Sequence, residues 1–228
     1  MLILGIDTSG RSGGMTLAEG DQQTFRALES SSIAGGTFSA QLVPTLAALL
    51  EKQQFTPADI GCFAVASGPG SFTGLRVGLS AVKGLVEVLG TPIAAVSLLE
   101  ALAILSERRG LVTAALDAGR AEIFSGLYEV SQGQARRISE NLFTQAEFLQ
   151  QLTSPRPGSI VSSDESVVQL VAANGGDVHA ELFPRPGSEL IARIGLSKLL
   201  RNETVSIEEL DANYIRRSDA ELSFMKNK

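Results

Sequence analysis

The sequence predicts a mixed α/β fold built from two similar halves of the chain. Short apolar runs, typical of buried strands, alternate with longer segments whose apolar residues recur at helical spacing. The opening pattern also returns, because Leu2–Asp7 and Leu111–Asp117 both end in aspartate before a turn with Gly-Arg and a second apolar run. We therefore expect two duplicated units, residues 1–109 and residues 110–228, with a boundary near Arg109-Gly110.

The first half is expected to begin with three strands, at Leu2–Thr8, Met15–Ala18 and Gln23–Leu28. A loop rich in Ser and Gly should follow at Ser30–Thr37. Ser39 is expected to cap a helix that runs to Gln53, since Ser is a favoured N-cap residue. The remaining elements are expected to be a strand at Cys62–Ala66, a helix at Gly74–Leu89, a strand at Ile93–Val96 and a helix at Leu98–Arg108.

The second half is less regular, and two of its helices carry the clearest signals. Thr144–Leu152 begins with a capping box, in which Thr144 is the cap and Glu147 stands three residues later. Ser188–Leu200 is amphipathic, and the polar chain from Asn202 either packs back on the fold or stays mobile. The other expected elements are strands at Leu111–Asp117, Ile123–Val130 and Ile160–Ser162 and a helix at Glu165–Ala173.

Composition excludes several classes of function. The chain of 228 residues has a net charge of −6, and its basic residues never form a run longer than a pair, which argues against direct, tight nucleic-acid binding. The single Cys62 excludes an internal disulfide and fits a reducing compartment, so we expect the cytoplasm. The single His179 cannot supply a two-histidine zinc motif. No apolar run reaches the length of a membrane helix, and the first apolar segment is interpreted as a core strand, not a signal peptide.

The glycine-rich segment Ser67–Gly78 follows an apolar strand and opens a helix, which is an arrangement that often binds phosphate. It does not match the known nucleotide motifs, because Leu75-Arg76 follows Gly74 where a Walker loop needs Lys-Ser or Lys-Thr, and Thr73 stands where the Rossmann pattern needs glycine. The helix that follows is apolar over most of its circumference. Such a helix must be buried on two sides, either in the core or against a second protein.

Asp7 and Asp117 leave two interpretations open. Each follows an apolar strand, the position at which actin-like and sugar-kinase-like folds hold the metal and phosphates of a nucleotide. Gly119 supplies the glycine usual in such loops, whereas the first turn lacks it. The simpler interpretation is that each aspartate stabilises its own turn. An actin-like ATPase or small-molecule kinase that uses both aspartates is therefore the alternative function.

The segment Ser67–Gly78 closely resembles the signature of the bacterial TsaB (YeaZ) family, the non-catalytic partner subunits in threonylcarbamoyladenosine modification of tRNA. Further segments that resemble the family extend the likeness over nearly the whole chain: Asp7-Thr8, Ser39–Pro44, Asp117–Arg120 and Tyr214–Arg216. Two positions depart from the family pattern, Phe38 where His is common and Ala212 where Pro is common. A changed residue at either position would affect contacts with the partner and leave the role of the chain the same.

The resemblance implies an actin-like fold of two units and a scaffold role without catalytic residues. It implies a heterodimer with the catalytic subunit TsaD, which transfers the threonylcarbamoyl group to the adenosine beside the anticodon, and a third, ATP-hydrolysing subunit, TsaE. The contact would use the helices at residues 39–53 and 74–89. We expect a homodimer when the chain is alone, tRNA contacts made by the partners, and ATP or ADP only in the complex. The residues expected to bind the partner are Leu42, Leu46, Leu49, Leu75, Gly78, Leu79 and Val82.

Overall fold

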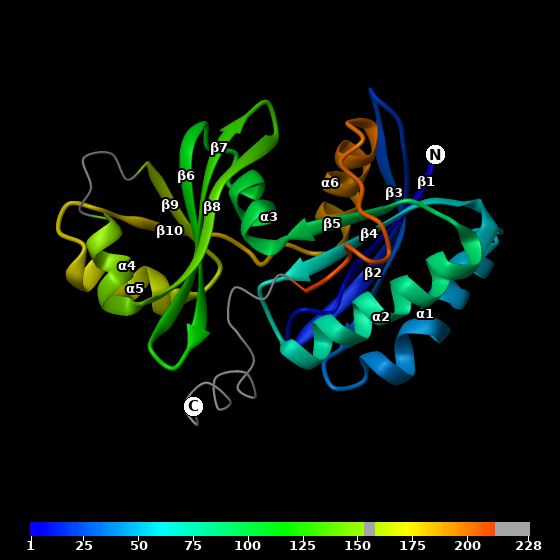
Figure 1. Ribbon diagram of the computed structural model, residues 1–228, viewed down its shortest axis with the longest axis horizontal. Coiled ribbons are helices and arrows are strands. Elements are labelled where there is room, and N and C mark those ends of the chain that lie inside the picture. Colours follow the sequence, from blue (N-terminus) through cyan, green and yellow to red (C-terminus); the bar gives the residue numbers. More distant parts are fainter. Residues whose placement is uncertain (153–157, 213–228) are drawn as a thin grey trace. The chain divides into compact units, whose positions relative to one another are not determined.

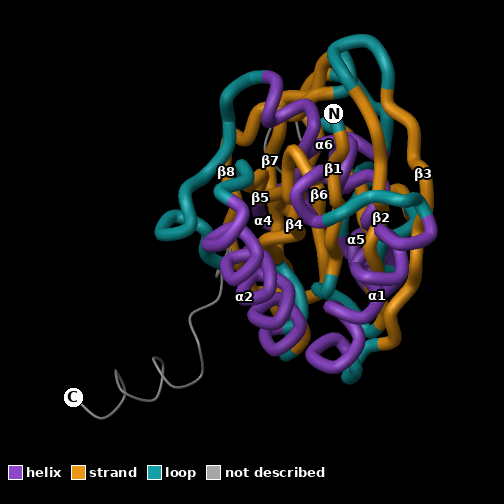
Figure 2. The backbone as a smooth tube through the Cα atoms, turned by 90° about the vertical axis from the view of Figure 1, so that its right-hand side faces the viewer, coloured by secondary structure: helices purple, strands orange, loops and turns teal. Residues whose placement is uncertain are grey.

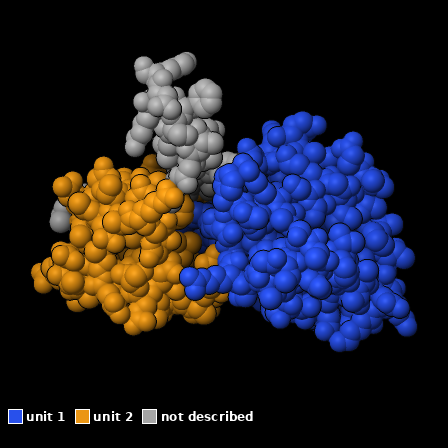
Figure 3. All heavy atoms as spheres, turned by 90° about the horizontal axis from the view of Figure 1, so that it is seen from below, with its two compact units in different colours: residues 1–101, 186–212 blue, residues 102–185, 213–228 orange. Residues whose placement is uncertain are grey.

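The computed structural model describes residues 1–152 and 158–212, which divide into two compact units (Figures 1 and 3). Unit 1 comprises Met1–Ala101 and Pro186–Ala212, and the described part of unit 2 lies within Leu102–Arg185. The predicted division at Arg109-Gly110 therefore differs from the structure in two ways. The chain passes from unit 1 to unit 2 earlier, and Pro186–Ala212 returns to unit 1, where its helix covers the first sheet.

Unit 1 contains a five-stranded sheet in the order β3-β2-β1-β4-β5. The central strand β1 pairs antiparallel with β2 and parallel with β4, so the sheet is mixed. The strands are β1 (Leu2–Asp7), β2 (Ser12–Gly20), β3 (Phe25–Ala34), β4 (Ile60–Gly68) and β5 (Ile93–Ser97).

Helices cover both faces of this sheet. On one face, α1 (Phe38–Lys52) and α2 (Phe72–Leu89) pack on side chains such as Leu4 and Phe63 in one buried apolar cluster. On the other face lies α6 (Ser188–Leu200), since Gly5, next to Leu4 in β1, lies directly against Ala192. Side chains alternate between the two faces of a strand, so the core of unit 1 has a layer on each side of the sheet.

Unit 2 repeats the strand order of unit 1. Its sheet runs β8-β7-β6-β9-β10, which matches β3-β2-β1-β4-β5 position by position, with the same antiparallel and parallel pairings around the central strand. The predicted mixed α/β fold of two similar units is confirmed. The boundary between the units falls within α3 (Leu98–Leu105). The elements that follow it in unit 2 are β6 (Gly110–Gly119), β7 (Glu122–Ser131), β8 (Gln134–Thr144), α4 (Gln145–Leu152), β9 (Ser159–Ser162), α5 (Glu165–Asn174) and β10 (Ala180–Leu182).

The core of unit 2 lies between its sheet and two helices. Apolar side chains of β6, β7 and β9 are buried together with Phe148 and Leu152 of α4 and with Val167 and Val171 of α5. The predicted capping box is confirmed at the start of α4. There Thr144 N donates to Glu147 Oε2 over 2.8 Å, and Glu147 N donates to Thr144 Oγ1 over 3.3 Å. The Thr144 hydroxyl also donates to Glu147 Oε2, and the hydrogen bonds that this carboxyl accepts from the Thr144 backbone and hydroxyl lower its pKa.

The strands that sequence patterns miss lie at the edges of the sheets, whereas the interior strand β2 was predicted but only over Met15–Ala18. The loop predicted at Ser30–Thr37 is wrong up to Ala34, because β3 continues to that residue. Thr37 replaces Ser39 as the N-cap residue of α1. The edge strands β8 and β10 were not predicted. Edge strands have a neighbour on one side only. The polar, partly exposed side chains of β8 hide its apolar alternation, and β10 has only three residues, too few for a periodic pattern. The segment Tyr214–Arg216 lies outside the described residues.

Candidate functional site

The turn after β1 is built around Asp7, whose side chain is 4% exposed. Its Oδ1 accepts hydrogen bonds from Ser9 N, over 2.9 Å, and from the Ser9 hydroxyl. An aspartate that accepts from the backbone two residues later is a common way to hold a tight turn. The carboxylate is thus used within the chain, as in the simpler of the two interpretations.

The glycine-rich segment connects β4 to α2 and lies against the same turn. Ser71 N donates to Ser9 O over 2.7 Å, so the segment is hydrogen-bonded to the backbone after Asp7. Ser71 is also the N-cap residue of α2, and its hydroxyl accepts from Gly74 N over 3.2 Å. The helix ends at Gly90, which has a φ of 67°. These contacts set where α2 begins and ends relative to the sheet.

All seven residues that the sequence analysis assigns to partner binding lie inside unit 1. Six of them are apolar side chains that are at most 5% exposed, and Gly78 is buried as well. All of them except Leu75 and Gly78 belong to one buried apolar cluster on the inner sides of α1 and α2, which lie beside each other (Figures 1 and 2). Since these positions fill the core, a protein that docks on the two helices must first meet their outward residues. The seven are Leu42, Leu46, Leu49, Leu75, Gly78, Leu79 and Val82.

Among the outward residues of the two helices, which also include polar ones such as Ser80 and Glu87, five apolar or small residues form what we call the outer face: Val43 and Ala47 of α1, with Phe72, Gly84 and Val88 of α2. Val43 is 61% exposed and Val88 is 84% exposed. The Arg76 guanidinium lies 3.7 Å from the centre of the Phe72 ring, and a side chain at Gly84 would project into open space. The sequence analysis did not assign these five residues to partner binding, because it chose apolar residues that recur at helical spacing, and those lie on the inner sides of the helices.

Asp117 ends the equivalent strand of unit 2, but it is exposed. Its Oδ1 accepts from Gly119 N over 2.7 Å, and its Oδ2 accepts from the Ser166 hydroxyl over 2.9 Å. Its own N–H donates to Asp164 Oδ2 over 2.8 Å. Both aspartates therefore stabilise turns. As candidate nucleotide ligands, Asp7 in unit 1 and Asp117 with Gly119 in unit 2 stay a prediction.

The other chemically distinctive side chains fit structural roles. Cys62 is buried in β4, and burial raises the pKa of its thiol to about 12, so the thiol is unreactive near neutral pH. His179 is exposed. Across residues 1–152 and 158–212, no three His, Cys, Asp or Glu side chains gather in a way that could hold a metal ion. Over the same residues, no helix is long and apolar enough to cross a bilayer.

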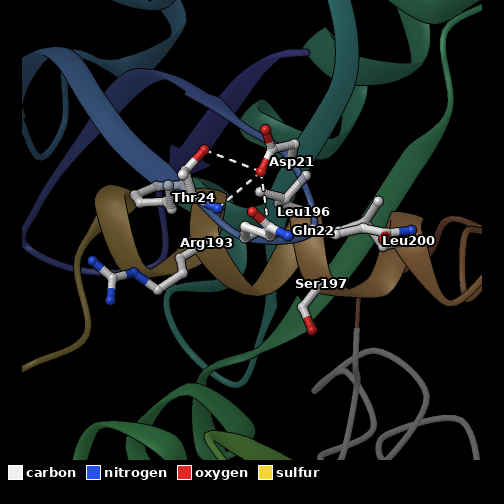
Figure 4. Close-up of a pocket in the computed structure, with 9 residues that line it drawn as sticks. Asp21, Gln22, Thr24, Arg193, Leu196, Ser197 and Leu200 are labelled. Atoms are coloured by element: carbon white, nitrogen blue, oxygen red, sulfur yellow. Dashed lines mark hydrogen bonds between the residues drawn. The ribbon is translucent and has the colours of Figure 1, made fainter.

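An open pocket of about 360 Å³ lies between the β2–β3 turn and α6 in unit 1 (Figure 4). One wall is the turn itself, where Asp21 Oδ1 accepts from Gln23 N and Thr24 N, hydrogen bonds that lower the pKa of this carboxyl. The other wall is α6, where the Arg193 guanidinium lies 4.9 Å from the centre of the Phe25 ring. The sequence analysis did not predict this pocket, because its two walls are far apart in the chain.

Comparisons with known proteins agree with this architecture. The family model described as "TsaD: tRNA N6-adenosine threonylcarbamoyltransferase" matches residues 31–215. The tRNA threonylcarbamoyladenosine biosynthesis protein TsaB of Bacillus subtilis (strain 168) is 29% identical, over all of this chain and 99% of that protein. A tRNA N6-adenosine threonylcarbamoyltransferase of Tropheryma whipplei (strain Twist) is 34% identical over 40% of this chain and 26% of its own length.

The solved structures place the fold in the same group. YeaZ from Pseudomonas aeruginosa superimposes with a TM-score of 0.73 at 24% identity, covering 92% of this chain and 99% of that one. The predicted actin-like fold is confirmed by this match together with the two sheets of identical strand order. The protein belongs to the family of the TsaD model and is similar over its whole length to the TsaB protein of Bacillus subtilis.

Proposed function

We propose that this chain acts in the biosynthesis of threonylcarbamoyladenosine in tRNA as the non-catalytic, TsaB-type subunit. The observation that carries this proposal is the match to the TsaB protein of Bacillus subtilis over the full length of both chains. A match over one unit alone would support only a shared fold, whereas this match includes both units and the signature segment between β4 and α2.

The partner in this proposal is a TsaD-type catalytic subunit, and the contact is the outer face. Two neighbouring helices present ridges and grooves into which helices of another protein can pack at interaxial distances of about 8–10 Å. Gly84 would let a partner backbone approach closely, because nothing lies over it within unit 1. Val43, Val88 and Phe72 would supply apolar area, and a stable interface of ordinary size buries about 1,600 Å² in total.

The rest of the proposal concerns the assembly around this contact. A TsaE-type ATPase would act on the pair, and ATP or ADP would bind only in the complex. When no partner is present, two copies of this chain would cover their outer faces against each other, because exposed apolar patches favour association. With a net charge of −6, the chain would leave contacts with tRNA to its partners, and the assembly would work in the cytoplasm.

The experiment that tests the proposal is co-elution with the TsaD-type protein of the same organism on a sizing column. Val88→Asp and Val43→Asp place a charge on the outer face without touching the core, since both side chains are largely exposed. We expect the unchanged chain to co-elute and the double variant to elute separately. Leu182→Asp is the matched control, because Leu182 is 55% exposed but lies in unit 2. Separate elution of the unchanged chain would contradict the proposal.

A further inference from the structure

Three glycines of the signature segment lie against the turn that follows β1. A Cβ atom added to Gly70 would lie 2.5 Å from Ser9 O, and one added to Gly74 would lie 2.0 Å from Thr8 O. One added to Gly78 would lie 2.4 Å from Thr8 Oγ1. Real Cβ atoms do not approach so closely. The three glycines are spaced four residues apart, so in and just before α2 they form one stripe, into which the turn fits.

The turn is held by its own hydrogen bonds as well as by its contact with the helix. Asp7 holds Ser9 through its buried Oδ1, and Ser9 O in turn accepts from Ser71 N at the start of α2. A chain of contacts thus runs from the end of the central strand, through the turn, to the first residues and the second turn of the helix. The start of α2 is therefore in direct contact with this turn as well as with the apolar core.

Thr8 is the residue at the centre of this contact, and its hydroxyl has an unusual environment. The side chain is 1% exposed, and Thr8 Oγ1 is a buried oxygen without a hydrogen-bond partner among the residues that the structure describes. Burying a polar atom without a hydrogen-bond partner destabilises the folded state. The Thr8 hydroxyl therefore does not stabilise the fold through a hydrogen bond. At Gly78, the Thr8 side chain acts through its shape, because it occupies the space into which a Cβ atom of residue 78 would project.

We propose that Asp7, Thr8 and Ser9 are positioning residues that set the orientation of α2 and thereby the partner-binding outer face. This inference rests on the proposed function, since it assigns the turn a role in the same contact. In this proposal, the turn after β1 packs against the signature glycines and holds α2 in the orientation in which its outer face can bind the partner.

A double-mutant cycle between Thr8 and Gly78 tests the inference. Gly78→Ala introduces the 2.4 Å contact, whereas in a Thr8→Ala background the nearest remaining Thr8 atom, Cβ, would be 3.5 Å away, which is ordinary contact. The affinity for the TsaD-type partner is measured by calorimetry below the melting temperature of each variant. We expect Gly78→Ala to weaken binding about tenfold and the double variant to recover to within about threefold of the unchanged chain.

Thr8→Ala and Thr8→Val extend the test in case Gly78→Ala does not fold. Val keeps the shape of Thr and loses only the unpaired hydroxyl, so we expect Thr8→Val to bind like the unchanged chain. Thr8→Ala removes the contact with Gly78 and should weaken binding. If hydroxyl chemistry were the role of Thr8, Thr8→Val would lose as much affinity as Thr8→Ala, and the inference would be wrong.

The outcomes separate this inference from the proposed function. A lowered melting temperature with unchanged affinity in Gly78→Ala would mean that the contact stabilises the fold only, which overturns the positioning role. A double variant that binds no better than Gly78→Ala would overturn it too. Absence of binding by the unchanged chain would instead overturn the proposed function and, with it, the partner that α2 is oriented to meet.

Discussion

The two units have the same strand order, but the turn after the central strand is buried in unit 1 and exposed in unit 2. In unit 1, Asp7 is buried, and the turn after it is covered by α2. In unit 2, Asp117 is exposed, and its turn is held by side chains of Ser166 and Asp164 at the start of α5. The turn therefore has the same position in both units but different surroundings. In unit 1 this position supports a helix, whereas in unit 2 it stays open to solvent.

The largest difference in unfolding free energy between the two turns should appear when a glycine at each turn is replaced by alanine. Gly74→Ala would bring Cβ within 2.0 Å of a backbone oxygen that no side-chain rotation can relieve, so we expect a loss of unfolding free energy of about 3 kcal/mol. Gly119→Ala in unit 2 has open space but a φ of 68°, which costs about 1–2 kcal/mol. Urea denaturation of both variants measures the difference. Equal losses would mean that α2 can shift away from the turn.

Removing each aspartate should produce the next largest difference. Asp7→Ala leaves Ser9 N without its acceptor in a buried turn, and hydrogen bonds to charged groups contribute about 1.5–3 kcal/mol. Asp117→Ala affects a turn that water reaches, so we expect a loss below about 1 kcal/mol. Thermal unfolding followed by circular dichroism compares the two. A larger loss for Asp117→Ala would show that burial does not decide the role of these carboxylates.

Ion pairs give a smaller contrast between the units. In unit 1, Lys198 Nζ lies 2.9 Å from Glu100 Oε2, and the side chains are 17% and 11% exposed. In unit 2, Arg108 pairs with Glu181 while both side chains are more than 40% exposed. Lys198→Met should lower the free energy of unfolding by about 1–2 kcal/mol, because the largely buried Glu100 carboxylate loses this ion pair. Arg108→Met should lower it by less than about 0.5 kcal/mol, because its ion pair is exposed. Chemical denaturation at low and high salt checks both values. A greater loss for Arg108→Met would reverse the expected order.

The smallest expected signal is binding of nucleotide to the isolated chain. Because the turn after Asp7 is covered, we expect no saturable heat in a titration with Mg·ATP. Binding at micromolar affinity that Asp117→Ala removes would favour the alternative function, an actin-like ATPase or kinase. It would also place the active turn in the unit where the aspartate is exposed.

Much of this fold can be predicted from sequence, because burial leaves a periodic pattern. The strand at Leu2–Asp7 and the helix at Ser188–Leu200 agree closely with the prediction, since each has a continuous or regularly spaced apolar face. The edge strand β8 could not be predicted, because its exposed residues include charged side chains such as Arg136 and Arg137.

The candidate site was predictable only in part. The signature segment and its helix are visible as glycines followed by an apolar stretch. The contact of Gly74 and Gly78 with Thr8 joins residues more than sixty positions apart, and spacing along the chain does not reveal it. For the same reason, spacing did not reveal that the residues predicted to bind the partner are buried, whereas Val88 on the same helix is exposed.

The most direct test of the proposed role is a calorimetric titration of the TsaD-type protein into this chain. We expect saturable binding at a ratio of one to one. The affinity should fall at least about tenfold in Val88→Asp and stay unchanged in Leu182→Asp, while both variants keep the melting temperature of the unchanged chain. Equal binding by all three chains would contradict the assignment of the outer face. No binding by any of them would contradict the proposed function itself.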